Sequence, residues 1–133
     1  FLCCKEFGSK MLSTNKGSII NIASLGAHVA IPNSVAYCAS KGAVAQLTRT
    51  LAVEWAKRGV RVNALTPGVF ETPLLKQCID QDADYGKRML EKIPMGRFGN
   101  PKEITGPALF LASDYASYIT GHILCVDAGY LAQ

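Results

Sequence analysis

Tyr37 and Lys41, which carry acid–base side chains, stand four residues apart. On a helix this spacing places both side chains on one face. A phenol ordinarily loses its proton near pH ~10, and a neighbouring ammonium favours the phenolate, so the pair could move a proton to or from a substrate oxygen. Ser24 precedes Tyr37 by 13 residues and could hold that oxygen through its hydroxyl. Alone, such a pair also arises by chance, and then the tyrosine would cover a core, the lysine would be a surface charge and the serine would only form a turn.

A second candidate is the stretch Thr66-Pro67-Gly68-Val69. Proline fixes the backbone φ angle, and glycine lets another group approach the main chain closely. The stretch could therefore lie beside a flat ligand. The alternative is an ordinary turn at the end of a strand.

The surrounding elements would bring these candidates together. The β-branched run at 18–23 and the run at 60–65 indicate strands, and 36–58 predicts a long helix between them. Strand–helix–strand units form parallel sheets with right-handed crossovers, and ligands bind beyond the carboxyl ends of such strands. Ser24 and Thr66-Pro67-Gly68 both fall at those ends.

The remaining segments continue the pattern. We expect a helix over 1–13, short surface helices within 73–95, a helix over 100–113 and a strand over 122–127. Asn100 as N-cap, Pro101 and Glu103 mark the start of the last helix. Four apolar residues form the expected inward stripe of the long helix: Val44, Leu47, Leu51 and Trp55. Gly59 is expected to end that helix.

Composition limits the function classes. The 133 residues are 49% hydrophobic and 18% charged with a net charge of +4, which is typical of a globular domain. The basic residues are scattered, so we expect no nucleic-acid partner, and no apolar run predicts a membrane span.

The chain begins at Phe1 without a signal-peptide pattern, which indicates a piece of a longer protein. Five cysteines without paired spacing indicate a reducing, cytoplasmic location, with Cys38 and Cys125 as apolar packing residues.

No metal site is expected. Asp80, Asp82, Asp84 and Glu91 match part of a calcium-loop pattern, but Tyr85 stands where that loop requires glycine. His28 and His122 are isolated, without metal-ligand spacing.

Several motifs together resemble the classical short-chain dehydrogenase/reductase family. In chain order they are Ser24, Tyr37-Cys38-Ala39-Ser40-Lys41-Gly42, Val62-Asn63-Ala64-Leu65-Thr66-Pro67-Gly68, Gly96-Arg97-Phe98-Gly99-Asn100-Pro101 and Val126-Asp127-Ala128-Gly129. The resemblance covers essentially the whole chain and implies an α/β fold, the C-terminal half of a Rossmann-like doubly wound parallel sheet. Asp127-Ala128-Gly129 departs from the family's usual Asp-Gly-Gly, which affects the geometry of the last turn.

The resemblance also implies roles for individual residues. Tyr37 would be the general acid or base, Lys41 would support it and hold the nicotinamide ribose, and Ser24 would hold the substrate oxygen. The cofactor, NAD or NADP, would further contact Pro67, Gly68, the Val69 backbone and the Thr72 hydroxyl. The family's Gly-rich phosphate-binding half and its catalytic Asn do not occur here, so residues 1–133 would form a single partial domain, inactive or aggregating alone.

The expected function is the interconversion of a secondary alcohol and a ketone. The resemblance favours a sugar acid or polyol as substrate, with 3-oxoacyl-carrier-protein reductase as the alternative, and it implies a homotetramer or homodimer. Two rivals from other classes are a non-catalytic Rossmann-like assembly subunit and a methyltransferase. Six apolar residues of the covering segment 70–99 could line a substrate pocket or bury against the sheet: Phe70, Leu74, Leu75, Met89, Met95 and Phe98.

Overall fold

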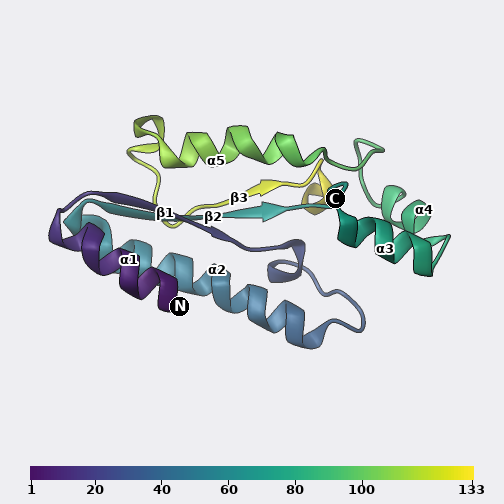
Figure 1. The fold of residues 1–133 in the computed structure, drawn as a ribbon, viewed down its shortest axis with the longest axis horizontal. Coiled ribbons are helices and arrows are strands. Elements are labelled where there is room, and N and C mark those ends of the chain that lie inside the picture. Colours follow the sequence, from purple (N-terminus) through teal and green to yellow (C-terminus); the bar gives the residue numbers. More distant parts are fainter.

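The computed structural model describes all residues from 1 to 133, and they form three layers (Figure 1). A sheet lies between α1 and α2 on one face and α5 on the other. The helices are α1 (Leu2–Ser13), α2 (Val35–Trp55), α3 (Pro73–Gln81), α4 (Tyr85–Leu90) and α5 (Thr105–Ala112). The strands are β1 (Gly17–Ile22), β2 (Val60–Pro67) and β3 (Ile123–Val126). Short 3-10 turns are η1 (Leu25–Ala27), η2 (Ala56–Arg58), η3 (Pro101–Ile104), η4 (Asp114–Ala116) and η5 (Tyr130–Ala132).

The three strands are parallel and follow the order β1-β2-β3. Ile22 of β1 is level with Leu65 of β2, and Leu65 is level with Leu124 of β3. The predicted α/β class with a parallel sheet is therefore confirmed. All strands point toward the end of the molecule where α3 and α4 lie (Figure 1).

Side chains of β2 alternate between the two faces of the sheet, as the pleat requires. Val60 and Val62 pack with Leu51 on the α2 side, whereas Leu65 packs with Leu111 on the α5 side. Strands that are buried on both faces need apolar residues on both. The runs at 18–23 and 60–65 therefore predicted strands with helices on either side. Three residues of the predicted α2 stripe, Leu47, Leu51 and Trp55, pack in the α2-side cluster.

The predicted helix ends are confirmed. Gly59 follows η2 with φ +67, and a Cβ there would lie 2.2 Å from the Asn15 carbonyl oxygen, so only glycine fits. Asn100 and Glu103 form a complete capping box, although the first turn, η3, is a 3-10 turn that leads into α5.

Asn63 is fully buried within β2 and holds the segment that leads into β3. Its Nδ2 donates to the Ile119 carbonyl at 2.9 Å, and its Oδ1 accepts from the His122 N–H at 3.0 Å. Both ends of the amide are thus satisfied by backbone, as a buried polar group requires.

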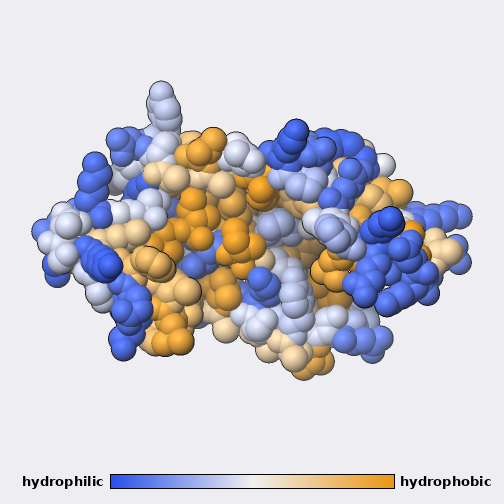
Figure 2. All heavy atoms as spheres, viewed as in Figure 1, coloured by the Kyte–Doolittle hydropathy of each residue, from blue (hydrophilic) through white to orange (hydrophobic).

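β1 forms an open edge of the sheet, with β2 as its only neighbour. Ile22 at its end is half exposed, and apolar atoms gather between α1 and α5 on the face shown in Figure 2. None of the helices has the length and apolar character that crossing a bilayer would take.

Candidate active site

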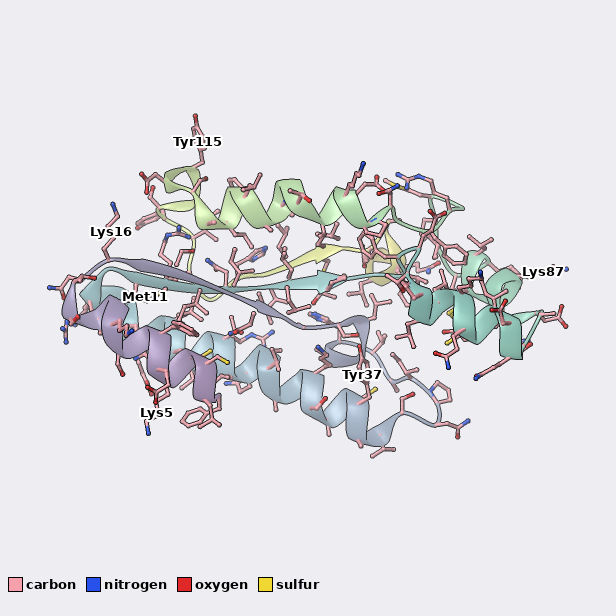
Figure 3. The ribbon with its side chains drawn as sticks, viewed as in Figure 1. Lys5, Met11, Lys16, Tyr37, Lys87 and Tyr115 are labelled. Carbon is pink, nitrogen blue, oxygen red and sulfur yellow. The ribbon has the colours of Figure 1, made fainter.

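Ser24 and Tyr37 meet at what we call the carboxyl rim, meaning residues 23–28 after β1 and 66–72 at and after the end of β2. Ser24 caps η1 by accepting the Gly26 N–H, and Tyr37 lies in the first turn of α2. The Tyr37 hydroxyl donates to Ser24 Oγ at 2.9 Å. A Cβ on Gly26 would lie 3.4 Å from the Tyr37 ring, so η1 packs directly against the phenol. Figure 3 shows Tyr37 between the start of α2 and this turn.

The hydrogen bonds of Ser24 leave it one proton to offer. Its Oγ accepts from Gly26 N at 3.3 Å and from the Tyr37 hydroxyl at 2.9 Å. A hydroxyl has two lone pairs and one proton, so both acceptor positions are used and the proton is free for a third oxygen. Ser24 itself is only 8% exposed whereas Tyr37 is 47% exposed. A ligand can therefore reach this pair from the side of Tyr37.

Lys41 lies on the same face of α2 as Tyr37, as its spacing predicts. Its Nζ donates to the Ile22 carbonyl at 3.0 Å, and it lies 5.9 Å from the centre of the Tyr37 ring. The ammonium is thus fixed by the backbone at the end of β1. An ammonium has three donors, and this one has one protein partner, so two donors remain for a ligand.

The second candidate stretch also lies on the carboxyl rim, but Gly68 has a structural reason to be glycine. Its N–H donates to the Val126 carbonyl at 2.9 Å, and a Cβ there would lie 2.7 Å from Cα of Asp127. The sequence predicted that another group lies close to this glycine, and in the structure that group is the backbone at the end of β3.

Val69 and Thr72 keep free donors beside that turn. The Val69 carbonyl accepts from Gly99 N, whereas the Val69 N–H has no hydrogen-bond partner. Thr72 caps α3 by accepting the Leu75 N–H at 3.3 Å, which leaves its own proton unused. Pro67 closes β2, level with Val126. An amide group could accept from both Val69 and Thr72.

His28 is a rim residue that the sequence reasoning missed. It follows η1 directly, and its Nε2 lies 2.9 Å from Oγ1 of the buried Thr66. The two residues are 38 positions apart, so no local pattern could have indicated the contact.

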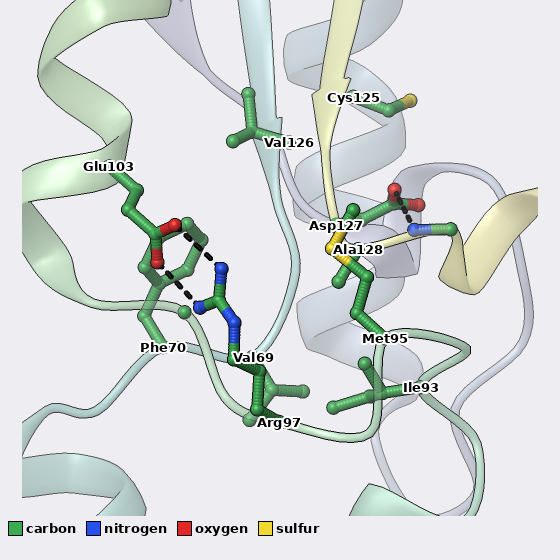
Figure 4. Close-up of a pocket in the computed structure, with 12 residues that line it drawn as sticks. Val69, Phe70, Ile93, Met95, Arg97, Glu103, Cys125, Val126, Asp127 and Ala128 are labelled. Carbon is green, nitrogen blue, oxygen red and sulfur yellow. Dashed lines mark hydrogen bonds and ion pairs between the residues drawn. The ribbon is translucent and has the colours of Figure 1, made fainter.

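A cavity of about 400 Å³ lies on the other side of Val69, toward β3 (Figure 4). Its lining residues are Val69, Phe70, Ile93, Met95, Arg97, Gly99, Glu103, Cys125, Val126, Asp127, Ala128 and Gly129. Ser24, Tyr37 and Lys41 are absent from this lining, so the cavity and the acid–base pair are separate features. Phe70 and Met95 line the cavity, whereas Leu75 is buried and Leu74 is largely exposed.

The cavity wall is held by an ion pair. Arg97 makes two contacts of 2.8 Å with the Glu103 carboxylate (Figure 4). The Arg97 hydrogen bond, followed by that from the Asn100 N–H, lowers the pKa of Glu103 to about 2. This ties the segment before α5 to the first turn of that helix.

The prediction that Cys125 packs in apolar surroundings is wrong. Leu124 and Val126 of β3 pack on the α5 side, so Cys125 points to the opposite face of the sheet, where it is not part of the α2-side cluster and is exposed. Partial burial, and then the nearby Asp127 carboxylate, raise the pKa of its thiol. Cys38 is half-buried near Gly26, and Cys4 is the cysteine that lies in the core.

The acidic run in the covering segment has local partners. Asp82 forms an ion pair with Arg88, and its Oδ1 also accepts the Asp84 N–H. No group of three or more His, Cys, Asp or Glu side chains converges to hold a metal ion.

The chain is similar in sequence to known proteins. A family model described as enoyl-(acyl carrier protein) reductase matches residues 1–131. Galactitol 2-dehydrogenase (L-tagatose-forming) of Cereibacter sphaeroides is 48% identical over 132 residues, covering 98% of this chain and 52% of that protein. Inactive 2-(S)-hydroxypropyl-CoM dehydrogenase 2 of Xanthobacter autotrophicus is 44% identical over 135 residues, covering 99% and 59%.

A solved structure has a closely similar fold. The gluconate 5-dehydrogenase of Burkholderia cenocepacia, in complex with NADP and tartrate, superimposes with a TM-score of 0.93 at 35% identity. The match covers 98% of this chain and 51% of that one. The chain thus spans about half the length of the relatives it matches. With its parallel sheet, its Ser24–Tyr37 contact and a family model that matches nearly every residue, the chain belongs to the short-chain dehydrogenase/reductase family.

Proposed function

We propose that the protein containing this chain is an NAD(P)-dependent oxidoreductase that interconverts a secondary alcohol and a ketone. The observation that supports this most is the 2.9 Å contact of the Tyr37 hydroxyl with Ser24 Oγ, one helical turn from the Lys41 ammonium. These three residues are the catalytic set that we propose.

The chain's own residues would handle the proton and the substrate oxygen. The free proton of Ser24 would bond the carbonyl oxygen, which places it beside the Tyr37 hydroxyl. Tyr37 would protonate that oxygen in reduction and remove its proton in oxidation, and Lys41 would stabilise the phenolate that forms. Because η1 packs against the phenol, the ring is held in place for this transfer.

The residues present fit a nicotinamide cofactor. The two free donors of Lys41 suit ribose hydroxyls, and the free Val69 N–H and Thr72 hydroxyl suit a carboxamide. Pro67 and Gly68 would keep the Val69 backbone at the rim. When bound, the cofactor supplies hydride chemistry. We propose that the remaining half of the dinucleotide site lies in sequence outside residues 1–133, which would form a partial domain.

A sugar acid or polyol is the proposed substrate class. Its support is the similarity to a galactitol dehydrogenase and to a gluconate 5-dehydrogenase whose structure contains tartrate. The second candidate is reduction of an acyl-carrier-protein substrate. The family model's description and the apolar lining of the cavity by Phe70, Ile93 and Met95 favour it.

Further proposals concern assembly and location. Apolar side chains are exposed on α2 and α5 at Val53, Leu109 and Phe110, which supports a homodimer or homotetramer through these helices and β3. The five cysteines are all free, which supports a cytoplasmic location. Light scattering of the full-length protein would measure its assembly state.

Substitution Tyr37→Phe in the full-length protein tests the mechanism. Gluconate, galactitol and an acyl-thioester ketone are assayed with both nicotinamides. We expect the variant to lose about 10²- to 10⁴-fold in kcat, the usual contribution of a general acid or base. Tyr115→Phe is the control because Tyr115 is 91% exposed at the opposite end of the sheet (Figure 3). Unchanged turnover in Tyr37→Phe would exclude the mechanism, and no turnover in the wild type would favour a non-catalytic subunit.

A further inference from the structure

His28 lies on the carboxyl rim, close to the ends of both β1 and β2. Its Nε2 lies 2.9 Å from Thr66 Oγ1, which ties the residue after η1 to the end of β2. Thr66 has the same parity along β2 as Val60 and Val62, which face α2. The His28 ring therefore lies on the α2 side of the sheet, the side that also carries Tyr37.

The burial of Thr66 determines which ring nitrogen of His28 carries the proton. Thr66 is completely buried, and its hydroxyl has no hydrogen-bond partner except His28 Nε2. A buried hydroxyl proton needs an acceptor, and here Nε2 is the only one within reach. Thr66 therefore donates to Nε2, and the neutral imidazole carries its proton on Nδ1.

The Nδ1–H of His28 has no partner within the protein. His28 is an exposed residue, and its Nδ1 makes no hydrogen bond in the structure. A donor with fixed orientation thus remains free at the rim.

His28 is also close in the fold to the acid–base pair. Ser24 caps the start of η1 and His28 caps its end, so a single 3-10 turn separates them. Gly26 in the middle of that turn packs against the Tyr37 ring. The Ala23 N–H donates to the Leu65 carbonyl, which sets the start of this turn level with Thr66.

We propose that His28 is a specificity-determining residue whose Nδ1–H binds a second oxygen of the substrate, beside the carbon that is oxidised or reduced. The ligand chemistry is a hydroxyl or carboxylate oxygen adjacent to the reacting carbinol, as in a vicinal diol or a 2-hydroxy acid. This inference rests on the proposed function and adds a reason why such substrates would be preferred over simple alcohols.

A merely structural His28 predicts something different. If its only role were to anchor η1 to Thr66, its loss would affect all substrates equally. A specificity role affects the KM of substrates that carry the second oxygen, because the donor contacts that oxygen and not the reacting one.

Two substitutions separate the two ring nitrogens. The side-chain amide of His28→Asn reaches the position of Nδ1 but not that of Nε2, whereas the amide of His28→Gln reaches the position of Nε2. His28→Asn therefore keeps the proposed substrate donor, and His28→Gln keeps the Thr66 contact. His122→Ala is the matched control because His122 is the chain's other histidine and lies before β3, at the opposite end of the strands.

The kinetic test compares 2,3-butanediol with 2-butanol, which differ by one hydroxyl, in the full-length protein. We expect His28→Gln to reduce the preference for the diol about fivefold through KM, the effect of one neutral hydrogen bond, while His28→Asn and His122→Ala keep it. An unchanged preference in His28→Gln, or its loss in His28→Asn alone, overturns the inference. A parallel pair, 2-hydroxybutyrate and 2-butanol, shows whether a carboxylate serves as the second oxygen.

The outcomes also separate the inference from the proposed function. A wild type that turns over none of these compounds, nor the earlier panel, refutes the proposed function and the role of His28 with it. Turnover with a substrate-independent His28 effect refutes the inference alone. Nitrogen-15 NMR of labelled protein tests the tautomer without turnover: we expect the Nδ1–H form for the signal that His28→Gln removes, and the Nε2–H form would contradict the geometry.

Discussion

Replacing Gly68 with alanine tests what this glycine does at the carboxyl rim. A Cβ at Gly68 would lie 2.7 Å from Cα of Asp127, and backbone cannot rotate away as a side chain can. The ends of β2 and β3 must then separate by several tenths of an ångström, next to the 2.9 Å bond from Gly68 N to the Val126 carbonyl.

The cost of Gly68→Ala follows from two effects. Overfilling a packed site costs about 1–3 kcal/mol, and weakening one backbone hydrogen bond costs up to about 1 kcal/mol. We therefore expect the free energy of unfolding to fall by about 2–3 kcal/mol. Gly106→Ala is the control because Gly106 lies in α5 with open space at its Cβ position. Alanine in a helix should increase that free energy by about 0.5–1 kcal/mol, so the two variants change stability in opposite directions.

Urea unfolding at one fixed protein concentration measures both variants, since an oligomer's stability depends on concentration. The KM for NADH and NADPH is measured alongside. If Gly68→Ala is as stable as the wild type, the packing of Gly68 on Asp127 is wrong. If its stability is unchanged and only the nicotinamide KM rises, the glycine serves cofactor approach, as the family resemblance implies.

Three further changes should have distinct effects. Asn63→Ala should lower the free energy of unfolding by about 2–3 kcal/mol, because two buried backbone groups lose their partners. Ala128→Gly should raise it by up to about 1 kcal/mol in urea unfolding, because Ala128 has a φ of +55, which glycine adopts more readily. The folded-state pKa of Glu103 is about 2, below its usual 4.5, so its ion pair with Arg97 contributes stability above pH 4.5 and loses it as the pH falls toward 2. Glu103→Gln should remove that part of the acid-induced fall in stability, and an identical pH profile would contradict it.

Local sequence patterns predicted the elements because each depends on neighbours in the chain. The strand runs, the α2 stripe and the Asn100 capping box rest on spacings of two to four residues. The Tyr37–Lys41 pair is of the same kind, since helix geometry alone puts the two residues on one face.

The features that the sequence did not predict are contacts between distant segments. Lys41 bonds the Ile22 carbonyl, 19 residues away, where spacing could indicate only a shared face with Tyr37. Gly68 meets Asp127, and Cys125 is exposed because it points to the face of β3 that the α2-side cluster does not cover. None of these contacts produces a pattern within a dozen consecutive residues of the sequence.

The register between β1 and β2 connects the two kinds of feature. Ile22 is level with Leu65, so the residues that leave β1 arrive beside those that end β2, and His28 can reach Thr66. A slip of one residue would turn Thr66 to the α5 face and move Val62 out of the α2 cluster, because side chains alternate. The apolar residues that fix the register for packing therefore also fix the distances at the carboxyl rim. The arrangement of Ser24, Tyr37 and His28 is a consequence of how the core packs, even though none of the three belongs to it.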